Sequence, residues 1–137
     1  MLHVILDLYQ CNADLLENEA YLRQVLQDLP GQIGMQQVGP VELRSIGEVT
    51  NPNDAGYSGF VIIASSHCSI HAWKPYRMVN MDVFSCNPFD PAVVVAFAQE
   101  RFETTDTEVQ VVERALRSPR PSSFRDSSSP TREKQRT

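Results

Sequence analysis

The stretch IIASSHCSIHAWKP, residues 62–75, joins an unbroken apolar run to a segment in which polar and apolar residues alternate. The secondary structure predicted for these two segments sets the fold predicted for the chain around them. Residues 60–64 form an unbroken apolar run, which predicts a short strand buried on both of its faces. Polar and apolar side chains then alternate over residues 68–74, as they do in a strand with two unlike faces. One face is predicted to carry Ser69, His71 and Trp73, and the other Cys68, Ile70 and Ala72. The stretch therefore predicts two successive strands with serine, histidine and cysteine side chains at their junction.

One helix is predicted before these strands in the sequence, and one after them. The first covers residues 13–29, with Asn12 as its N-cap and with the proline-glycine pair that follows ending it. Its core-facing side chains recur at helical spacing and are Leu15, Leu22, Val25, Leu26 and Leu29. The second covers residues 91–102, because Asp90 provides an N-cap and a proline occupies the first helical position. The side chains that it is expected to bury are Val94, Phe97 and Ala98.

Further strands are predicted over 3–10, 41–49, 78–86 and 107–116. The segment 78–86 continues the strand over 68–74, and the turn-forming residues of 50–59 predict a loop. The resulting order, β-α-β-β-β-α-β, favours hairpin-linked strands in an antiparallel sheet. We therefore predict an α+β fold, a two-layer sandwich with both helices packed on one face of the sheet.

Length and charge divide the 137-residue chain into one domain and a tail. Residues 1–116 are long enough to bury a core, and their six Lys/Arg against fifteen Asp/Glu give a net charge of −9. An acidic domain is a poor partner for nucleic acid, so none is predicted. Residues 117–137 carry a net +4 from six Lys/Arg and two acids, with six serines and three prolines. We predict that this tail is disordered, either as a solubilising segment or as a site for phosphorylation or an anionic partner.

The N-terminal residues and the cysteines indicate where the protein resides. MLHVILDLYQ lacks a basic region before its apolar residues, and Asp7 interrupts the run, so a strand is expected there and not a signal peptide. No apolar run is long enough to span a bilayer, and we expect a cytoplasmic protein with no membrane partner. In that compartment Cys11, Cys68 and Cys86 are expected to be free thiols.

The reactive side chains of residues 58–86 have ordinary explanations when each is taken singly. A histidine on a strand often only packs, and Cys86 at a strand end can be a small buried hydrophobe. A structural zinc site using His67, His71 and Cys86 lacks the paired spacing that such sites use, so no metal is predicted. The ASSHC segment also lacks the G-x-S-x-G form of a serine hydrolase.

Taken together, SSHCSIHAW and the MDVFSC segment that follows resemble the prokaryotic S-adenosylmethionine decarboxylase family. The family's hallmark is close to E-S-H-x-S-I-H-T-W-P-E, followed by a strand like D-V-F-T-C. The matching residues here are Ser66, His67, Ser69, Ile70, His71, Trp73, Asp82, Val83, Phe84 and Cys86. The segment GYSGF at 56–60 is similar to the family's glycine-serine-glycine loop and supplies Ser58, and HVILDLYQC resembles its first strand. The resemblance covers residues 1–116 and implies the same antiparallel sheet with helices on one face.

The resemblance implies a cofactor that the chain makes from itself. The hydroxyl of Ser66 attacks the carbonyl of Ser65, the chain is cut between them, and Ser66 becomes a pyruvoyl group. This group forms a Schiff base with the substrate amine and withdraws electrons while carbon dioxide leaves. The family's pattern makes His71 the proton acceptor in processing, with Ser58 assisting, and makes Cys86 the proton donor to the substrate. Members pair as homodimers with active sites at the interface, and their product feeds polyamine (spermidine) synthesis.

The sequence departs from the family's pattern in two places. Ser65 stands where the family has glutamate, and Lys74-Pro75 stands where it has proline and glutamate. The second glutamate is associated in the family with the ribose hydroxyls of the nucleoside substrate, and Pro75 has no side-chain acceptor for them. Three hypotheses follow. The chain decarboxylates S-adenosylmethionine, or it decarboxylates another amino acid such as ornithine or arginine with the same pyruvoyl chemistry, or it is an unprocessed homologue that regulates a true decarboxylase.

Overall fold

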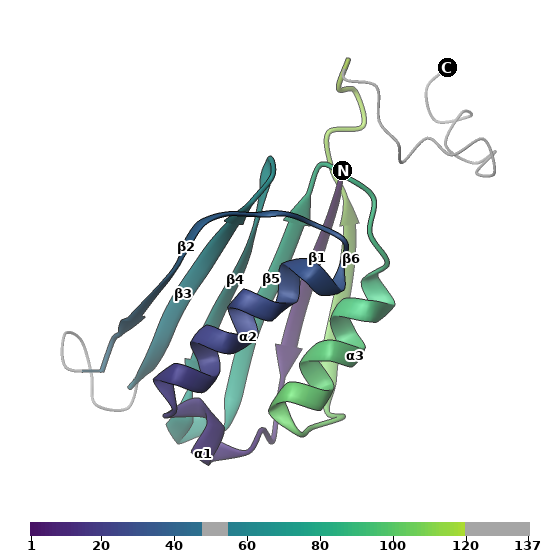
Figure 1. Cartoon of the computed structure of the whole chain (residues 1–137). Coiled ribbons are helices and arrows are strands. Elements are labelled where there is room, and N and C mark those ends of the chain that lie inside the picture. The colour runs from purple at the N-terminus through teal and green to yellow at the C-terminus, as the bar shows by residue number, and fades with distance from the viewer. Residues whose placement is uncertain (48–54, 120–137) are drawn as a thin grey trace.

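The computed structural model describes residues 1–47 and 55–119 of the chain. Its elements in chain order are β1 (Leu2–Leu8), α1 (Ala13–Leu16), α2 (Glu19–Gln32), β2 (Gln37–Ser45), β3 (Gly56–Ile63), β4 (Ser66–Trp73), the 3₁₀-helix η2 (Lys74–Tyr76), β5 (Met78–Ser85), α3 (Pro91–Phe102) and β6 (Thr107–Glu113). The strands form one six-stranded sheet in the order β2-β3-β4-β5-β1-β6, and neighbouring strands are antiparallel. Figure 1 shows α2 and α3 lying across the same face of this sheet. The predicted α+β two-layer sandwich is therefore confirmed.

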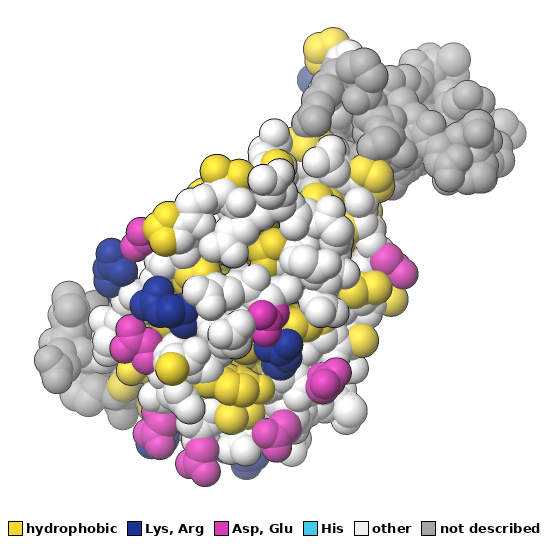
Figure 2. All heavy atoms as spheres, viewed as in Figure 1, with side chains coloured by type: hydrophobic (Ala, Val, Ile, Leu, Met, Phe, Trp, Pro, Cys, Tyr) yellow, Lys and Arg dark blue, Asp and Glu magenta, His cyan; other side chains and the backbone are white. Residues whose placement is uncertain are grey.

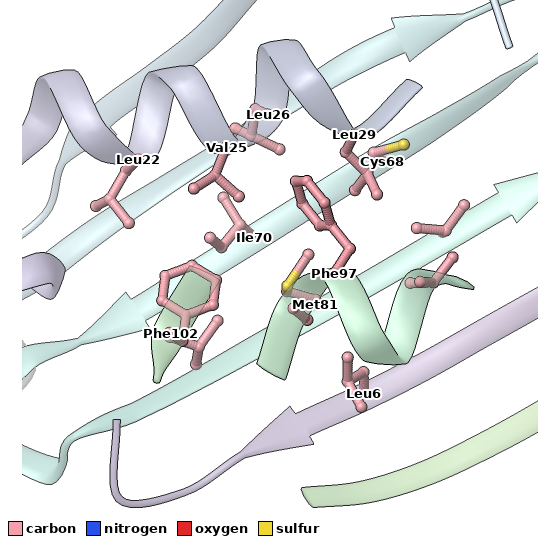
Figure 3. Close-up of a cluster of buried hydrophobic side chains, with 14 of the residues drawn as sticks. Leu6, Leu22, Val25, Leu26, Leu29, Cys68, Ile70, Met81, Phe97 and Phe102 are labelled. Atoms are coloured by element: carbon pink, nitrogen blue, oxygen red, sulfur yellow. The ribbon is translucent and has the colours of Figure 1, made fainter. Parts of the chain in front are cut away.

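The core lies between the sheet and these two helices. Each strand contributes every second side chain to it, because successive side chains point to opposite faces of a sheet. Figure 3 shows Leu6 of β1, Ile70 of β4 and Met81 of β5 together with side chains of α2 and α3, among them Leu22 and Phe102. Burial of an apolar side chain of this size stabilises the fold by about 1.5–3 kcal/mol relative to exposure. We call this side of the sheet the covered face.

The opposite side, which we call the open face, has no helix over it within residues 1–47 and 55–119. On the four inner strands, β1, β3, β4 and β5 in turn, its side chains are His3, Ile5 and Asp7, then Ser58, Phe60 and Ile62, then His67, Ser69, His71 and Trp73, and then Asn80, Asp82 and Phe84. The prediction that the strand over 60–64 is buried on both faces is therefore wrong. Val61 and Ile63 are fully buried on the covered face, whereas Phe60 and Ile62 are 43% and 45% exposed.

The predicted helix over 13–29 is two helices. Asn12 caps α1 as predicted, and the side chain of Asn18 then caps α2 by accepting a hydrogen bond from the N–H of Tyr21. The proline-glycine pair does not end α2, which continues to Gln32 with Pro30 inside it, although proline removes one helical hydrogen bond. The Pro30 carbonyl accepts from the N–H of Met35, and the chain leaves the helix at Gly34, whose φ of +69° suits glycine.

The second helix was predicted correctly from its first turn. α3 begins at Pro91, and the Asp90 side chain accepts a hydrogen bond from the N–H of Ala92 at 2.9 Å. The side chains expected to face the core, Val94, Phe97 and Ala98, are buried. Strong N-terminal signals therefore placed this helix well.

The segment over 68–86 is two strands rather than one continuous strand, so the sheet has one strand more than predicted. The chain reverses through η2, and Arg77 takes the left-handed conformation with φ of +50° before β5 begins. Residues 56–59 of the predicted loop belong to β3, while residues 48–54 of that region and 120–137 of the predicted tail lie outside the described residues. No helix in the described part of the chain is long and apolar enough to cross a membrane.

Candidate active site

The Ser65–Ser66 peptide lies at a sharp corner of the sheet. Ile63 and Ser66 pair across β3 and β4, so only two residues join these strands. The second of them, Ser65, has φ of +65°, in the left-handed region that residues other than glycine rarely occupy. Holding a serine there costs of order 1–3 kcal/mol, which the surrounding strands must offset. The peptide bond that follows is therefore held in a strained turn between two rigid strands.

Two reactive side chains converge on the carbonyl oxygen of Ser65. The Ser66 hydroxyl lies 2.5 Å from it, and the Cys86 thiol lies 3.1 Å from it. The N–H of Cys86 also donates to Ser66 Oγ at 2.8 Å, so the end of β5 fixes the position of the hydroxyl. A hydroxyl beside the preceding carbonyl, together with a donor to that carbonyl's oxygen, is an arrangement suited to attack on the peptide bond.

Cys86 differs from the other two cysteines in its surroundings. All three are free thiols, but Cys11 and Cys68 are fully buried. Burial raises the pKa of the Cys68 thiol to about 12 and that of the Cys11 thiol to about 11, so both stay protonated inside the core at neutral pH. Cys86 is only partly buried and faces a reactive peptide. It is therefore the cysteine placed for chemistry.

Ser58 and His71 form a second reactive pair. They lie opposite each other across β3 and β4, and Ser58 Oγ is 2.7 Å from His71 Nδ1. A pocket of about 290 Å³ lies beside them and is also lined by Glu42, Arg44 and Phe60. The pair belongs to the open face, and in Figure 2, which views the helix side, no histidine is visible. An imidazole bonded to a hydroxyl can accept and relay a proton.

The structure does not bring these two groups together within one chain. Ser66 begins β4 and His71 is its sixth residue, so their backbones are roughly 17 Å apart at about 3.4 Å per residue. The alternation of β4 also places His71 on the open face, whereas Ser66 lies at the β3–β4 corner, where its hydroxyl accepts from the Cys86 N–H. Of the four side chains expected to act, one chain therefore assembles Ser66 with Cys86, and separately Ser58 with His71.

Lys74 and Pro75, which depart from the family's pattern, lie in η2 directly after Trp73. Lys74 pairs with Glu17, which directly follows α1, so its charge is balanced by a neighbouring carboxylate. Pro75 is exposed within η2. Just before it, Trp73 Nε1 donates to Asn80 Oδ1 at 2.7 Å. Asn80 Nδ2 in turn donates to Asp7 at 2.7 Å. The sequence alone did not indicate this chain of hydrogen bonds, because it joins β4 and β5 to β1, which is distant from them in sequence.

A polar cluster near Ser66 was also missed. His67 Nε2 lies 3.2 Å from Asp82 Oδ1, and His3 Nε2 lies 3.8 Å from Asp82 Oδ2. These side chains come from β4, β1 and β5, which the sheet order brings side by side. Alternation within each strand could have placed each residue on the open face, but not the strands beside one another.

Comparison with known proteins gives one family. The family model for S-adenosylmethionine decarboxylase matches residues 2–115. An S-adenosylmethionine decarboxylase proenzyme of Clostridium botulinum (strain Hall) is 30% identical over 111 residues, covering 80% of this chain and 90% of its own length. A proenzyme of the same name from Archaeoglobus fulgidus is 34% identical over 84 residues, covering 61% of this chain and 69% of its own. The crystal structure of the adenosylmethionine decarboxylase from Aquifex aeolicus shares the fold, with a TM-score of 0.71 at 21% identity over 88% of this chain and 94% of that one.

Proposed function

Because this chain belongs to the S-adenosylmethionine decarboxylase family, we propose that it is a pyruvoyl-dependent S-adenosylmethionine decarboxylase that makes itself by cleavage between Ser65 and Ser66. Its product would supply the aminopropyl donor for spermidine synthesis. The observation that carries the proposal is the convergence of the Ser66 hydroxyl and the Cys86 thiol on the carbonyl of Ser65. The proposed compartment is the cytoplasm, where thiols such as Cys86 stay reduced.

Self-cleavage proceeds by an ester. Ser66 Oγ adds to the carbonyl carbon of Ser65, the C–N bond breaks, and the amine of residue 66 is freed. Loss of the Cα proton of residue 66 then breaks its Cβ–Oγ bond and releases residues 1–65 with a C-terminal carboxylate. The remaining enamine becomes an imine, and water hydrolyses it to a ketone with loss of ammonia. Residue 66 is then the pyruvoyl group.

Two features of the turn favour this reaction. The strained backbone of Ser65 raises the energy of the intact peptide, and cleavage relieves that strain. The Cys86 thiol, 3.1 Å from the carbonyl oxygen, donates to that oxygen as negative charge develops on it during attack. The rigid strands on both sides keep the hydroxyl and the carbonyl in contact, which removes most of the entropic cost of their encounter.

The finished site fits a pyruvoyl group at residue 66. The residue is only partly buried at the start of β4, so a substrate amine can reach it, and the N–H of Cys86 points at the side-chain oxygen that processing removes. When present, the pyruvoyl group supplies an electron sink for loss of carbon dioxide. Cys86 lies beside it, and its S–H is the proton donor for the substrate's α-carbon.

The separation of Ser58 and His71 from Ser66 supports a homodimer with shared sites. If these two residues serve processing, His71 as proton acceptor and Ser58 as hydroxyl donor, they must act on the Ser66 of a second copy. Both belong to the open face, which also exposes Phe60 and Ile62. Two such faces can stack at about 10 Å, as sheets do in β-sandwiches. In that arrangement each copy contributes to the site of the other.

The proposed substrate is S-adenosylmethionine, whose sulfonium cation suits the net charge of −9 over residues 1–116. Lys74, the added positive charge of the departing segment, is balanced by Glu17 and does not oppose a cation. Pro75 leaves the ribose without the glutamate of the family pattern, so discrimination for the nucleoside is expected to be weaker.

Mass and product measurements test the function together. The denatured protein is expected to show two fragments, residues 1–65 and a second beginning with a pyruvoyl group, and Ser66→Ala is expected to remain one chain. Carbon dioxide release is then measured from S-adenosylmethionine, ornithine and arginine at equal concentration. Release from the first substrate alone supports the proposal. A cleaved enzyme that prefers an amino acid without the nucleoside would contradict the substrate, and an uncleaved chain would contradict the whole mechanism.

A further inference from the structure

The cluster of His3, His67 and Asp82 has a place in the fold that the proposed chemistry does not use. Asp82 of β5 lies between the two imidazoles, 3.2 Å from that of His67 and 3.8 Å from that of His3. Oδ1 of Asp82 is buried and makes no hydrogen bond of good geometry among the described residues. The polar contact with His67 Nε2, 3.2 Å away, therefore offsets part of the cost of burying it.

An aromatic side chain, that of Phe84, packs against both histidines of the cluster. The centroid of the Phe84 ring lies 5.7 Å from that of His3 and 6.0 Å from that of His67. The guanidinium of Arg114 covers the Phe84 ring at 4.3 Å and approaches His3 Nδ1 at 3.5 Å. The charged and titratable groups of the cluster thus come from β1, β4, β5 and the segment after β6, and those against Asp82 are His3 and His67. The cluster is a defined and partly buried contact between strands.

Its position relative to the cleavage site is the decisive observation. The pairing of β4 with β5 ends at His67 and Phe84, so Ser66 lies one residue beyond the ladder and Cys86 two residues beyond it. Ser66 pairs instead with Ile63 of β3. Cys86 directly follows β5. The two reacting residues therefore lie at the open end of the β4–β5 hairpin, beyond the last paired residues, where strands fray most easily.

We propose that His67 and Asp82 are positioning residues that clamp β4 to β5 and so hold Ser66 and its scissile peptide against Cys86. Asp82 pairs in register with Ser69, two residues from His67, so the contact is a diagonal one across the ladder and resists sliding as well as separation. It preserves the 2.8 Å contact of the Cys86 N–H with Ser66 Oγ and the 3.1 Å contact of the thiol with the Ser65 oxygen. The role rests on the proposed self-cleavage, but the clamp itself does not.

The rate of self-cleavage tests the role in full-length precursor made by cell-free synthesis and followed by mass. We expect His67→Ala and Asp82→Ala to slow cleavage about 10- to 100-fold, since a displacement of 1 Å can cost that much. His67→Gln keeps an N–H that can donate to Asp82, and it is expected to stay within about threefold of the parent rate. Asp28→Ala is the matched control, because Asp28 pairs with Arg101 at 2.8 Å on the helix side with similar exposure, 31% against 34% for Asp82. It should leave the rate unchanged.

Hydrogen exchange of the backbone of residues 83–86 tests the clamp without relying on cleavage. Exchange should be at least about tenfold faster in His67→Ala and near the parent rate in His67→Gln. If the parent chain never cleaves, the proposed function fails while this measurement still decides the clamp. Unchanged exchange and cleavage in His67→Ala would overturn the inference. Equal loss of cleavage in the Gln and Ala variants would overturn it too, because His67 would then act in proton transfer and not in positioning.

Discussion

The two faces of the sheet are built from the same strands, but one packs against the helices and the other presents polar side chains. On the covered face β4 contributes Cys68 and Ile70, which are fully buried beneath the helices. On the open face the same strand contributes His67 and His71, which contact Asp82 and Ser58. One face holds the strands rigid, and the other presents groups that need a substrate or a second copy to act. Ser66 lies where the two meet, at the corner of the β3–β4 hairpin.

The largest expected effect is that of Ser66→Ala, which removes the attacking hydroxyl and leaves the fold intact. Cleavage and decarboxylation should both be abolished, while the free energy of unfolding changes by less than about 0.5 kcal/mol. Mass spectrometry and urea denaturation measure the two quantities. Ser45→Ala, at the exposed end of β2, is the matched control and should cleave normally. A cleaved Ser66→Ala chain would show that the hairpin corner is not the reacting peptide.

The open face is probed next by His71→Ala. Loss of the proton acceptor should slow cleavage about 10²- to 10⁴-fold, with little change in stability, because the ring is exposed and its neighbour Ser58 can bond to water. The measurement is the cleavage half-life of newly made precursor. A parent-like half-life would remove the open face from the processing reaction.

The covered face should respond in the opposite way. Ile70→Ala deletes buried methyl groups from the core and is expected to lower the free energy of unfolding by about 2–5 kcal/mol. Cleavage of the folded protein should stay near the parent rate, because Ile70 contacts no reacting group. Urea denaturation compares it with Val111→Ala on β6, where the side chain is 48% exposed and the expected loss is under about 1 kcal/mol. If Ile70→Ala slowed cleavage strongly without lowering the free energy of unfolding, the covered face would take part in the reaction, and the assignment of packing to one face and chemistry to the other would be wrong.

The smallest expected effect concerns the strain at the corner between the faces. Ser65→Gly suits a φ of +65° and should stabilise the uncleaved chain by about 0.5–1 kcal/mol. Stability is measured with Ser66→Ala also present, so that no cleavage interferes, and the rate is measured without it. The glycine variant should cleave a few-fold more slowly. Faster cleavage would mean that the strain does not assist the reaction.

Local signals predicted the parts of the fold that depend on neighbouring residues. The Asp90 cap and the proline after it placed α3, and alternation placed the two faces of β4. The strand at 60–64 was read as buried on both faces because an unbroken apolar run does not say how many layers cover a sheet. The proline-glycine pair predicted the end of the helix, yet α2 continues past Pro30 to Gln32, because a local breaker signal does not include the packing of the helix on the sheet.

The site was predictable only in part, because local sequence signals do not give the pairing and register of distant strands. Ser66 and Cys86 stand in a recognisable motif, and the structure brings them into contact through the Cys86 N–H. Their clamp could not be foreseen, because it needs the register of β1 and β4 against β5, which pairs His3 with Phe84 and His67 with the same residue. The distance between Ser66 and His71 was not predicted either. The two residues are only five apart in the sequence, but five residues of an extended strand span roughly 17 Å.

Mixing two impaired chains tests the shared site most directly. His71→Ala keeps the reactive turn and lacks the proton acceptor, whereas Ser66→Ala keeps the acceptor and lacks the turn. Alone, Ser66→Ala should remain uncleaved and His71→Ala should cleave at least about 10²-fold more slowly than the parent. When the two are folded together, the His71→Ala chain alone should be cut after Ser65, at a rate near that of the parent. No faster cleavage in the mixture, at a concentration where mixed dimers form, would contradict a site divided between the faces of two copies.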